Sequence, residues 1–359
     1  MSLPASSPPP SPTLAELGWD DPWATALAQA STGDALTPAR VARSDPGSCT
    51  ALSAAGALRA VTSRRAPVAV GDWVGTGGTG RGSSPGDPPR VEAVLPRRSA
   101  FSRAAEGRET REQVVAANLD TVLLAQGLDG RLSLSGLERY LALGWQSGAV
   151  PAVVLTKADL ASPEHVAQRA AAVEGIALGV PVHVLSAATG EGLEGLAPYL
   201  VPGRTIALLG PSGVGKSTLV NRLAGEELQA TGDVRSDGKG RHTTTRRELV
   251  VLPGGGVLVD TPGMRAVGLW DAEGGVERAF SDVERLAGEC RFSDCSHTVE
   301  PRCAVLDAVA AGRLDRRRLE SWRKLQRELR HLAGRQDARL RAEEQRRWKA
   351  LTRAGRGRR

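Results

Sequence analysis

The chain has 359 residues, of which 41% are hydrophobic and 24% are charged, and its formal net charge is +7 at pH 7. This length is enough for two or three domains with ample cores. No apolar run approaches the roughly 18 residues of a membrane span, and the N-terminus lacks the basic-then-apolar pattern of a secretory signal. Three of the only four cysteines lie close together, which indicates a metal site in a reducing compartment, the cytoplasm, rather than a disulfide framework.

The first hundred residues predict a short helix and then a small β-barrel. Residues 1–12 are rich in Pro and Ser and are expected to be disordered, and residues 14–30 predict one helix. Short apolar runs then alternate with turn signals, which is typical of a small barrel such as the five-stranded oligonucleotide-binding fold. Cys49 is isolated and is expected in the core rather than as a ligand. The predicted strands are 39–43, 49–53, 57–61, 67–74 and 90–95, with a Gly/Ser/Pro-rich loop at 75–89.

Apolar strands alternate with helical segments from residue 120 onward, after a basic, loop-like stretch at 96–111. Continuous apolar strands between helices predict a mostly parallel sheet that is covered on both faces. The predicted strands are 120–125, 150–155, 181–185, 204–209, 248–252 and 256–260, and the predicted helices are 134–147, 163–178 and one that begins at 217. The last two strands are expected to form a hairpin through a Pro-Gly-Gly turn.

The most specific motif is G-x-x-x-x-G-K-[ST] between a predicted strand and a predicted helix, the pattern of a phosphate-binding loop. Backbone N–H groups of such a loop and the helix N-terminus form an anion site. Lys216 would bridge the outer phosphates, and Ser217 would hold Mg²⁺ through its hydroxyl. A glycine-rich turn with a chance Lys-Ser is the alternative, which the flanking elements disfavour. The predicted phosphate-contacting residues are Gly210, Pro211, Ser212, Gly213, Val214, Gly215, Lys216, Ser217 and Thr218.

Two segments after this loop are predicted to respond to the γ-phosphate. Asp260 ends a Val-rich strand and would steady the Mg²⁺ shell, while Gly263 of the same D-x-x-G motif would donate its N–H to the γ-phosphate. In residues 238–245 a threonine, with Thr244 as the candidate, would coordinate Mg²⁺ in a switch; a polar surface loop is the alternative. Met264 stands where many GTPases have a water-orienting Gln, so we predict slow intrinsic hydrolysis that uses His242 or a group from a partner.

Two strand ends upstream are predicted to recognise guanine. The Asp159 carboxylate of a T-K-x-D motif can accept both N–H donors of guanine, a pair that adenine lacks, and the stem of Lys157 can pack along the base. Thr156 stands where the usual motif has Asn. Ser186 and Ala187 follow the next strand and fit a second guanine-contacting loop. The guanine motifs therefore precede the phosphate loop. This order is a circular permutation, in which the GTPase sheet ends just after the D-x-x-G switch.

Four residues with metal-binding side chains lie within a span of 14 residues near the C-terminus: Cys290, Cys295, His297 and Cys303, spaced C-x4-C-x-H-x5-C. Three thiolates and one imidazole complete a closed tetrahedral shell, which predicts structural zinc with no open position. Three buried cysteines and a surface histidine are the alternative. Helices are predicted at 306–312 and 314–332. The spacing of Trp322 with three leucines of the second helix indicates a core face rather than an RNA platform.

Positive charge is concentrated at the C-terminus. Residues 313–359 contain 18 Arg/Lys and 6 Asp/Glu, a net +12, so the rest of the chain is net acidic. A polyanion partner is one explanation, and a solvated helical face that is kept soluble by its charge is the other. Charge alone does not decide between them.

Together these motifs resemble the ribosome small subunit-dependent GTPase A family, which consists of circularly permuted bacterial GTPases. Residues 112–118, 137–143 and 240–245 also look like that family's pattern, and the resemblance covers about residues 13–335. It implies GTP/GDP, Mg²⁺ and one structural Zn²⁺ as cofactors, and it supports a catalytic role for His242. It also implies binding to the small ribosomal subunit and its rRNA during late maturation, with hydrolysis stimulated by the subunit and followed by release.

The expected protein is therefore multidomain. It has an N-terminal extension with a short helix (1–35), an oligonucleotide-binding β-barrel (36–100), an α/β circularly permuted GTPase domain (101–275), an α-helical zinc-binding domain (276–335) and a basic tail (336–359). We expect a monomer without a membrane partner, in which water attacks the γ-phosphate with Lys216, Asp260 and His242 as catalytic residues. Three alternatives are an RNA-binding switch with incidental hydrolysis, a GTPase with a transfer RNA or membrane partner, and an ATPase. The absence of lipidation signals disfavours the membrane, and Asp159 disfavours the ATPase.

Overall fold

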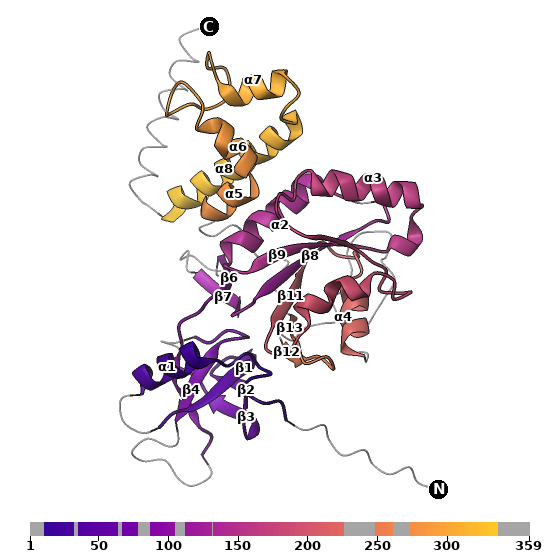
Figure 1. The fold of residues 1–359 in the computed structure, drawn as a ribbon. Helices are drawn as coiled ribbons and strands as arrows, with labels where there is room; N and C mark the ends of the chain where they lie inside the picture. Colours follow the sequence, from indigo (N-terminus) through magenta and orange to yellow (C-terminus); the bar gives the residue numbers. More distant parts are fainter. Residues whose placement is uncertain are drawn as a thin grey trace.

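The computed structural model describes residues 11–31, 35–63, 67–77, 87–104, 112–130, 132–225, 248–260 and 273–336. A barrel, a sheet flanked by helices and a helical unit follow one another along the long axis of the molecule (Figure 1). This order confirms the predicted three-part architecture. The Pro-rich start, most of the 75–89 loop and the tail beyond residue 336 lie outside the described residues, and the exact domain boundaries stay predictions.

The N-terminal part is a closed five-stranded barrel with the strand order β1-β2-β3-β5-β4. Small apolar side chains fill its interior, among them Cys49, whose thiol pKa is raised by burial to about 11. A thiol with this pKa is inert at neutral pH, as expected of a small core residue. The strands are β1 (Thr37–Asp45), β2 (Ser48–Ser53), β3 (Gly56–Val61), β4 (Trp73–Gly77) and β5 (Arg90–Val94).

The predicted N-terminal helix begins later than expected, at α1 (Asp21–Ala30), so its predicted start at residue 14 is wrong. Gly18 adopts a φ of +89° and packs so closely on Gly203 that a Cβ there would lie 2.7 Å from the Gly203 carbonyl oxygen. Asp20 then caps the helix by accepting a hydrogen bond from the Trp23 N–H at 3.2 Å. The sharp bend at Gly18 ends the preceding turn and forces the helix to start afresh.

The stretch predicted as a loop at 96–111 instead contains a strand. β6 (Ala100–Ala104) pairs antiparallel with β7 (Glu112–Ala117) as a separate two-stranded sheet. Phe101, which is 1% exposed, is the only large apolar side chain of β6. A single large apolar residue gives no readable alternation, which is why the sequence pattern did not reveal this strand.

The central sheet has the order β10-β9-β8-β11-β13-β12. All neighbouring pairs are parallel except β12 and β13, which form the expected antiparallel hairpin at one edge. Because the carboxyl ends of parallel strands lie at the same edge of a sheet, the loops that follow β8, β9, β11 and β13 meet there. The strands are β8 (Thr121–Gly127), β9 (Val150–Thr156), β10 (Val182–Val184), β11 (Thr205–Leu209), β12 (Glu248–Val251) and β13 (Val257–Asp260).

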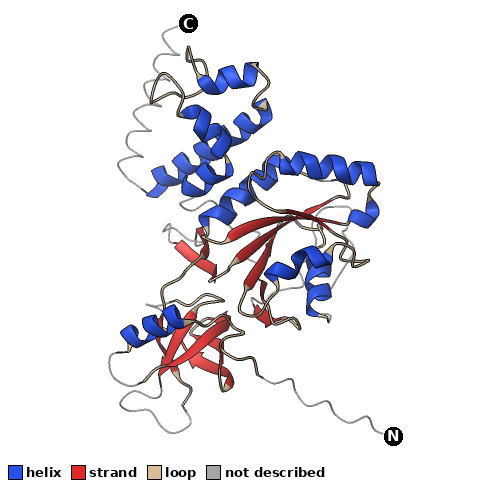
Figure 2. Cartoon of the chain, viewed as in Figure 1, coloured by secondary structure: helices blue, strands red, loops and turns tan. Residues whose placement is uncertain are grey.

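Helices cover both faces of this sheet, as predicted (Figure 2). On one face lie α2 (Leu134–Gln146) and α3 (Pro163–Glu174), and on the other lies α4 (Lys216–Ala224). Successive residues of β8 point to opposite sides: Val122 belongs to the core shared with α2, and Leu123 belongs to the core shared with α4. The continuous apolar run of the strand therefore reflects burial on two faces.

The C-terminal unit consists of α5 (Glu273–Ala279), α6 (Ser281–Ala287), α7 (Ala304–Ala310) and α8 (Arg316–Gln336). Leu325 on α8 is buried, and Trp322 packs against the same core and donates its Nε1–H to Glu284 at 2.7 Å. This arrangement confirms the predicted core face of the last helix. Helix α5 packs tightly on α2, since a Cβ at Gly275 would lie 2.3 Å from the Ala142 carbonyl oxygen.

A buried ion network joins the helical unit to the sheet layer. Arg318, 3% exposed, donates through Nε and Nη2 to Asp282 at 2.6 Å each and through Nη1 to Glu138 at 3.2 Å. Glu138 lies on α2 with no solvent exposure, and Arg317 contacts it at 3.1 Å. Two arginines of α8 therefore share one fully buried carboxylate of α2.

Replacing Glu138 by Ala is expected to lower the free energy of unfolding by about 3–5 kcal/mol, because the substitution leaves a buried guanidinium without one of its carboxylate partners. Urea unfolding of the full chain measures this change. Glu328→Ala is the matched control: its carboxylate also joins α8 to α2, through Arg139 at 2.7 Å, but both side chains are about one-third exposed. The control should cost no more than about 1 kcal/mol; equal losses would contradict the account.

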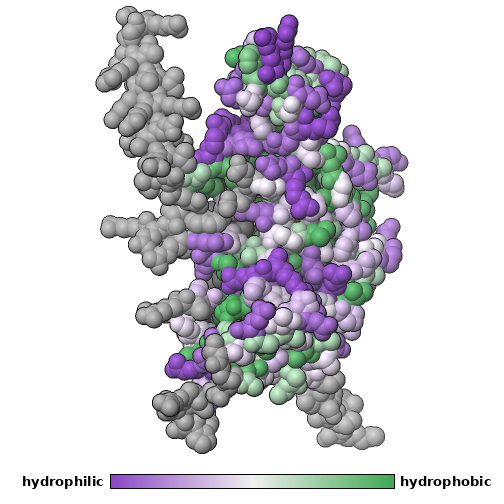
Figure 3. Space-filling model, turned by 60° about the vertical axis from the view of Figure 1, so that its left-hand side comes forward, coloured by the Kyte–Doolittle hydropathy of each residue, from purple (hydrophilic) through white to green (hydrophobic). Residues whose placement is uncertain are grey.

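On the face drawn in Figure 3, hydrophilic residues predominate over the helical unit and across the middle of the molecule, and hydrophobic residues form small, separate patches. The large hydrophobic residues that are exposed in the described part of the chain include Phe292 and Val299, both on the loop between α6 and α7. Among the described helices, none combines the length and the hydropathy needed to cross a bilayer.

Candidate nucleotide site and metal centre

The glycine-rich loop lies between β11 and α4, as its sequence predicts. Gly213 and Gly215 have φ values of +80° and +90°, in the left-handed region that favours glycine. Gly210 passes so close to β8 that a Cβ would lie 2.3 Å from the Ala125 carbonyl oxygen. The loop can therefore keep its path only with these small residues, and its backbone stays close to the N-terminus of α4, where an anion is stabilised.

Lys216 is the first residue of α4, and its side chain folds back over the loop. Its Nζ donates to the carbonyl oxygens of Gly210, at 2.8 Å, and of Pro211. Ser217 and Thr218 follow in the first turn of the helix and are half-buried. An ammonium at this position can contact phosphate oxygens held by the loop, and the Ser217 hydroxyl is of the kind that ligates Mg²⁺.

Thr156, which replaces the usual Asn, links the T-K-x-D segment to the phosphate loop. Its hydroxyl is buried, with the residue 1% exposed, and lies 3.1 Å from the Gln126 carbonyl oxygen and within hydrogen-bonding distance of the Val214 carbonyl oxygen. A hydroxyl can donate to only one acceptor at a time, so the two carbonyls share it. The side chain therefore connects the ends of β8 and β9 with the loop that follows β11.

Lys157 makes a second link between the same segments. Its backbone is left-handed, with φ at +61°, and its Nζ donates to the Gly213 carbonyl oxygen and to Asp129 Oδ2, both at 2.6 Å. Asp129 and Gln126 were not among the residues predicted from the sequence. The one feature that could have identified them is their position: both lie at the carboxyl end of β8, and β8 is the neighbour in the sheet of β11, the strand that precedes the phosphate loop.

The two predicted guanine loops are adjacent. Asp159 lies in the short 3₁₀ helix Ala158–Leu160 and is exposed, while the Ala158 N–H donates to the Leu185 carbonyl oxygen at 3.2 Å. Ser186 is buried, and its Oγ accepts a hydrogen bond from the Thr189 N–H at 3.2 Å. The carboxylate of Asp159 is therefore presented to solvent beside a loop whose backbone is fixed by its own hydrogen bonds.

Asp260 ends β13, the neighbour of β11, so it lies at the same sheet edge as the phosphate loop. The predicted switch residues His242, Thr244 and Gly263, and also Met264, lie outside the described residues. The structure therefore brings together the phosphate loop, both guanine segments and Asp260 at one sheet edge.

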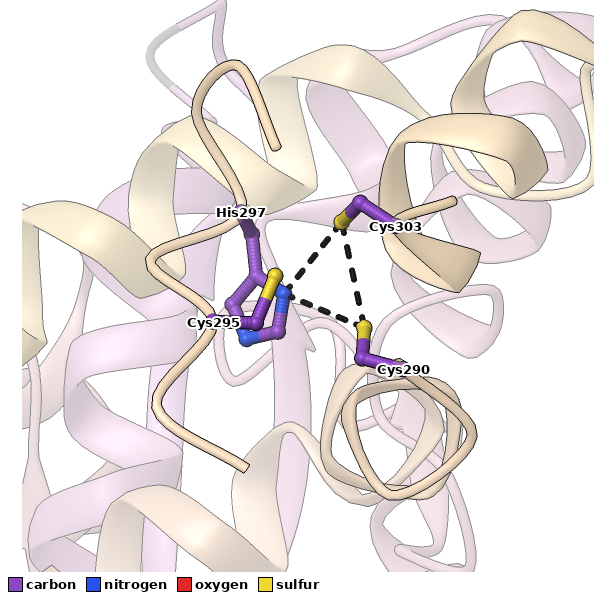
Figure 4. A group of neighbouring side chains, drawn as sticks. All are labelled: Cys290, Cys295, His297 and Cys303. Atoms are coloured by element: carbon purple, nitrogen blue, oxygen red, sulfur yellow. Dashed lines mark hydrogen bonds between the residues drawn. The ribbon is translucent and has the colours of Figure 1, made fainter. Parts of the chain in front are cut away.

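The four predicted metal ligands converge between α6 and α7 (Figure 4). Their ligand atoms all lie within 4.8 Å of one another. His297 Nδ1 is 3.5 Å from Cys290 Sγ and 3.4 Å from Cys303 Sγ. Cys290 follows α6, Cys303 caps α7, and Cys295 and His297 lie on the intervening loop. Four donors within a span of 14 residues can therefore surround one ion.

The chemistry of this cluster fits a zinc ion. Burial lowers the pKa of His297, with nearby Arg323 adding to this effect and Glu300 opposing it, which favours the neutral imidazole that a metal requires. Desolvation is the main cause that raises the pKa of the Cys295 thiol to about 11, so the thiol keeps its proton at neutral pH unless a cation replaces it. Three sulfurs and one imidazole nitrogen are a common structural zinc set.

The loop that carries two of these residues is held by a carboxylate. Glu300 accepts hydrogen bonds from the backbone N–H groups of Ser296 at 2.9 Å and Thr298 at 2.8 Å, and the hydrogen bonds with Ser296 and Thr298 keep the pKa of its carboxyl well below the usual range. His297, between them, takes a left-handed φ of +56°. A backbone turn that is held by Glu300 therefore orients the His297 imidazole toward the cysteines.

Known proteins resemble this chain over most of its length. Residues 94–270 match the model of the RsgA GTPase family. The chain is 49% identical to the "Small ribosomal subunit biogenesis GTPase RsgA" of Streptomyces avermitilis, a comparison that covers 97% of this chain and 94% of that protein.

Two solved structures share the fold. YjeQ from Thermotoga maritima superposes with a TM-score of 0.60 at 26% identity, over 82% of this chain and 98% of that one. YloQ, described as a circularly permuted GTPase, also superposes with a TM-score of 0.60, over 82% of this chain and 96% of that one. Its identity of 20% bears on the fold alone.

Proposed function

The chain belongs to the RsgA GTPase family, and from this premise we propose that it hydrolyses GTP to GDP and phosphate while it assists late maturation of the small ribosomal subunit. As a member of a GTPase family it is a GTP hydrolase. The subunit and its rRNA are its partners, and binding to the subunit stimulates hydrolysis, which then releases the protein. It acts in the cytoplasm as a monomer.

The observation that carries this proposal is the double link between the T-K-x-D segment and the phosphate loop. Thr156 reaches the Val214 carbonyl oxygen, and Lys157 reaches that of Gly213 at 2.6 Å. A segment that recognises a base and a loop that holds phosphates must keep a fixed separation to bind one nucleotide. These two bonds supply that constraint in the described structure.

We assign the residue roles from this arrangement and, for His242, Thr244 and Gly263, from the sequence motifs alone. Lys216 contacts the outer phosphates, Asp260 supports the Mg²⁺ shell, and His242 lies in the switch, where we assign it to catalysis. The Asp159 carboxylate accepts the two N–H donors of guanine, while Thr156 and Lys157 hold the guanine-binding segment against the phosphate loop. The remaining nucleotide contacts come from Ser186, Ala187, Gly210, Pro211, Ser212, Gly213, Val214, Gly215, Ser217, Thr218, Thr244 and Gly263, with Ser217 and Thr244 as the Mg²⁺ ligands. Cys290, Cys295, His297 and Cys303 hold one structural Zn²⁺.

Replacing Asp159 by Asn is expected to shift the nucleotide preference from GTP toward XTP. The amide can donate to the carbonyl that xanthine carries in place of guanine's amino group, while GTP loses two hydrogen bonds to a charged acceptor, a loss of about 100-fold in affinity. Competition binding with both nucleotides measures the shift. Asp129→Asn is the control: it weakens the anchor of Lys157 and should lower both affinities without changing their ratio. An unchanged ratio in Asp159→Asn would refute base recognition.

The subunit assignment is tested by nucleotide-dependent pelleting. Purified small and large ribosomal subunits are each centrifuged with the protein and either a non-hydrolysable GTP analogue or GDP. We expect the protein to co-sediment with small subunits when the GTP analogue is present but not when GDP is present. We expect no co-sedimentation with large subunits. Equal binding to both subunits, or none to either, would remove the ribosomal assignment and leave the GTPase activity in place.

A further inference from the structure

An open cavity of about 590 Å³ lies beside the Cys₃His cluster, between the 294–298 loop and α8. Arg323, Arg327 and Arg330 line it from α8 together with Trp322. These arginines recur at intervals of four and three residues, which places them on one face of the helix, over about 10 Å. Asp294 and Glu320 also line the cavity, so three cationic groups face two anionic ones.

The Arg323 guanidinium is distinctive because two of its donors are unused. Its Nε and Nη2 atoms are buried and have no hydrogen-bond partner among the described residues. In general, these two N–H groups form the edge of a guanidinium that binds an oxyanion through two parallel hydrogen bonds. Neither Asp294 nor Glu320 is paired with this edge in the described structure.

Two other arginines of this chain show what this edge normally holds. Arg97 uses Nε and Nη2 to bind both oxygens of Asp72, at 2.7 Å each. Arg318 binds Asp282 in the same way, at 2.6 Å each. The same edge of Arg323 is removed from solvent but empty, which is a costly arrangement for a charged donor. Arg323 also lines the cavity, so contact between this edge and a ligand there requires the guanidinium to turn toward the cavity.

We propose that this cavity binds a backbone phosphate of an RNA strand, with Arg323 as the bidentate donor and with Arg327 and Arg330 contacting the adjoining phosphates. This inference rests on the proposed function, since the RNA in question is that of the small ribosomal subunit. A polyanion fits better than a single carboxylate because the three arginines repeat along about 10 Å of helix, whereas one carboxylate needs only one of them. Asp294 and Glu320 offset two of the three positive charges, so binding is expected to depend on the paired hydrogen bonds of the Arg323 edge as well as on charge.

The test compares the full-length, zinc-loaded protein with its Arg323→Gln variant for binding to purified small subunits in the GTP analogue, at several salt concentrations. The variant should bind about 10-fold more weakly, and the slope of log affinity against log salt should fall by about 0.7–0.9, the value for one lost phosphate contact. Arg313→Gln removes an equal charge from an exposed site outside the cavity and should change affinity less than twofold. If wild-type protein fails to bind subunits, the proposed function fails; if both variants bind like wild type, only this inference fails.

Two further measurements separate a ligand site from a structural arginine. Zinc content and the thermal midpoint of Arg323→Gln should equal those of wild type, because the replaced donors make no bond in the described structure. Zinc loss would assign the edge to the cluster and overturn the proposal. Arg323→Lys keeps the charge without the paired donors and should recover less than half of the lost affinity. Full recovery would overturn the bidentate contact.

The source of the oxyanion is distinguished by competition against subunit binding. An unstructured RNA oligonucleotide is expected to displace the subunit from wild-type protein at a lower concentration than from Arg323→Gln. Inorganic phosphate and a poly-glutamate peptide should not compete at matched ionic strength. Competition by poly-glutamate with no effect of RNA would assign the cavity to an acidic protein segment and overturn the proposal.

Discussion

Replacing Lys216 by Ala is expected to lower kcat/KM for GTP by about 10²–10³-fold, the usual loss when one charged donor to a developing oxyanion is removed. In the described structure its Nζ lies across the phosphate loop, bonded to the carbonyl oxygens of Gly210 and Pro211. Those carbonyls hold the ammonium close to where the outer phosphates would sit. Phosphate release under multiple turnover, with Mg²⁺ present, measures the loss.

Lys324→Ala is the matched control for this experiment, because Lys324 is an exposed lysine on α8, outside the nucleotide site. It should leave turnover unchanged. Circular dichroism should show that Lys216→Ala is folded, since the substitution removes no core contact. Wild-type turnover in a folded Lys216→Ala protein would refute the phosphate role of this residue.

Replacing Cys303 by Ser is expected to release zinc and to unfold the helical unit, the largest stability effect that we anticipate. Zinc bound to a structural site of this kind contributes about 10–16 kcal/mol in isolated peptides, far more than any single packing contact. Cys303 is 1% exposed, caps α7 and accepts the Leu306 N–H at 3.5 Å. Loss of its thiolate therefore removes a metal ligand and disturbs a helix start together.

Metal analysis and thermal unfolding of the full chain test this expectation. Wild-type protein should contain one zinc per chain, and the variant should contain less than a tenth of that. Cys49→Ser is the control, because the Cys49 thiol is equally buried, in the barrel interior. This variant protein should keep its zinc, and its free energy of unfolding should fall by about 1–3 kcal/mol because a hydroxyl is buried. A Cys303→Ser variant that retains zinc would contradict the assignment of this residue as a ligand.

Much of the fold could be predicted because its signals are local. Turn residues separate the barrel strands, and the central strands are continuous apolar runs, so both β parts were predicted. The fourth barrel strand was misplaced: the prediction was 67–74, but the strand is Trp73–Gly77, because Gly71, with a φ of +88°, bends the chain before it. The errors have identifiable causes. Gly18 ends a turn through close packing on Gly203, a contact between residues far apart in the chain. The strand β6 carries one large apolar residue, which is too little for a periodic pattern.

The predicted nucleotide and metal residues stand out because their spacing reflects a chemical requirement. The residues that support them do not stand out in the sequence. Asp129, which anchors Lys157, and Glu138, which binds two arginines of α8, act through contacts across more than 25 residues of chain. Nothing in their neighbourhoods marks them, since an acidic residue on a helix or after a strand is usually solvated.

Thr156 illustrates how structure changes the meaning of a departure from a motif. In the sequence it weakens the guanine motif, because the usual residue there is Asn. In the structure its hydroxyl reaches the carbonyl oxygens of Gln126 and Val214 from a fully buried position. A short hydroxyl suffices for this link because the strand end passes close to the phosphate loop.

The most direct test of the account is GTP turnover with and without purified small ribosomal subunits. A protein whose switch has Met264 in place of a water-orienting residue is expected to hydrolyse GTP slowly alone. We predict at least about 10-fold faster turnover with small subunits and no change with large subunits. Turnover that is unaffected by small subunits, in protein that binds GTP normally, would contradict the claim that the subunit completes the catalytic site.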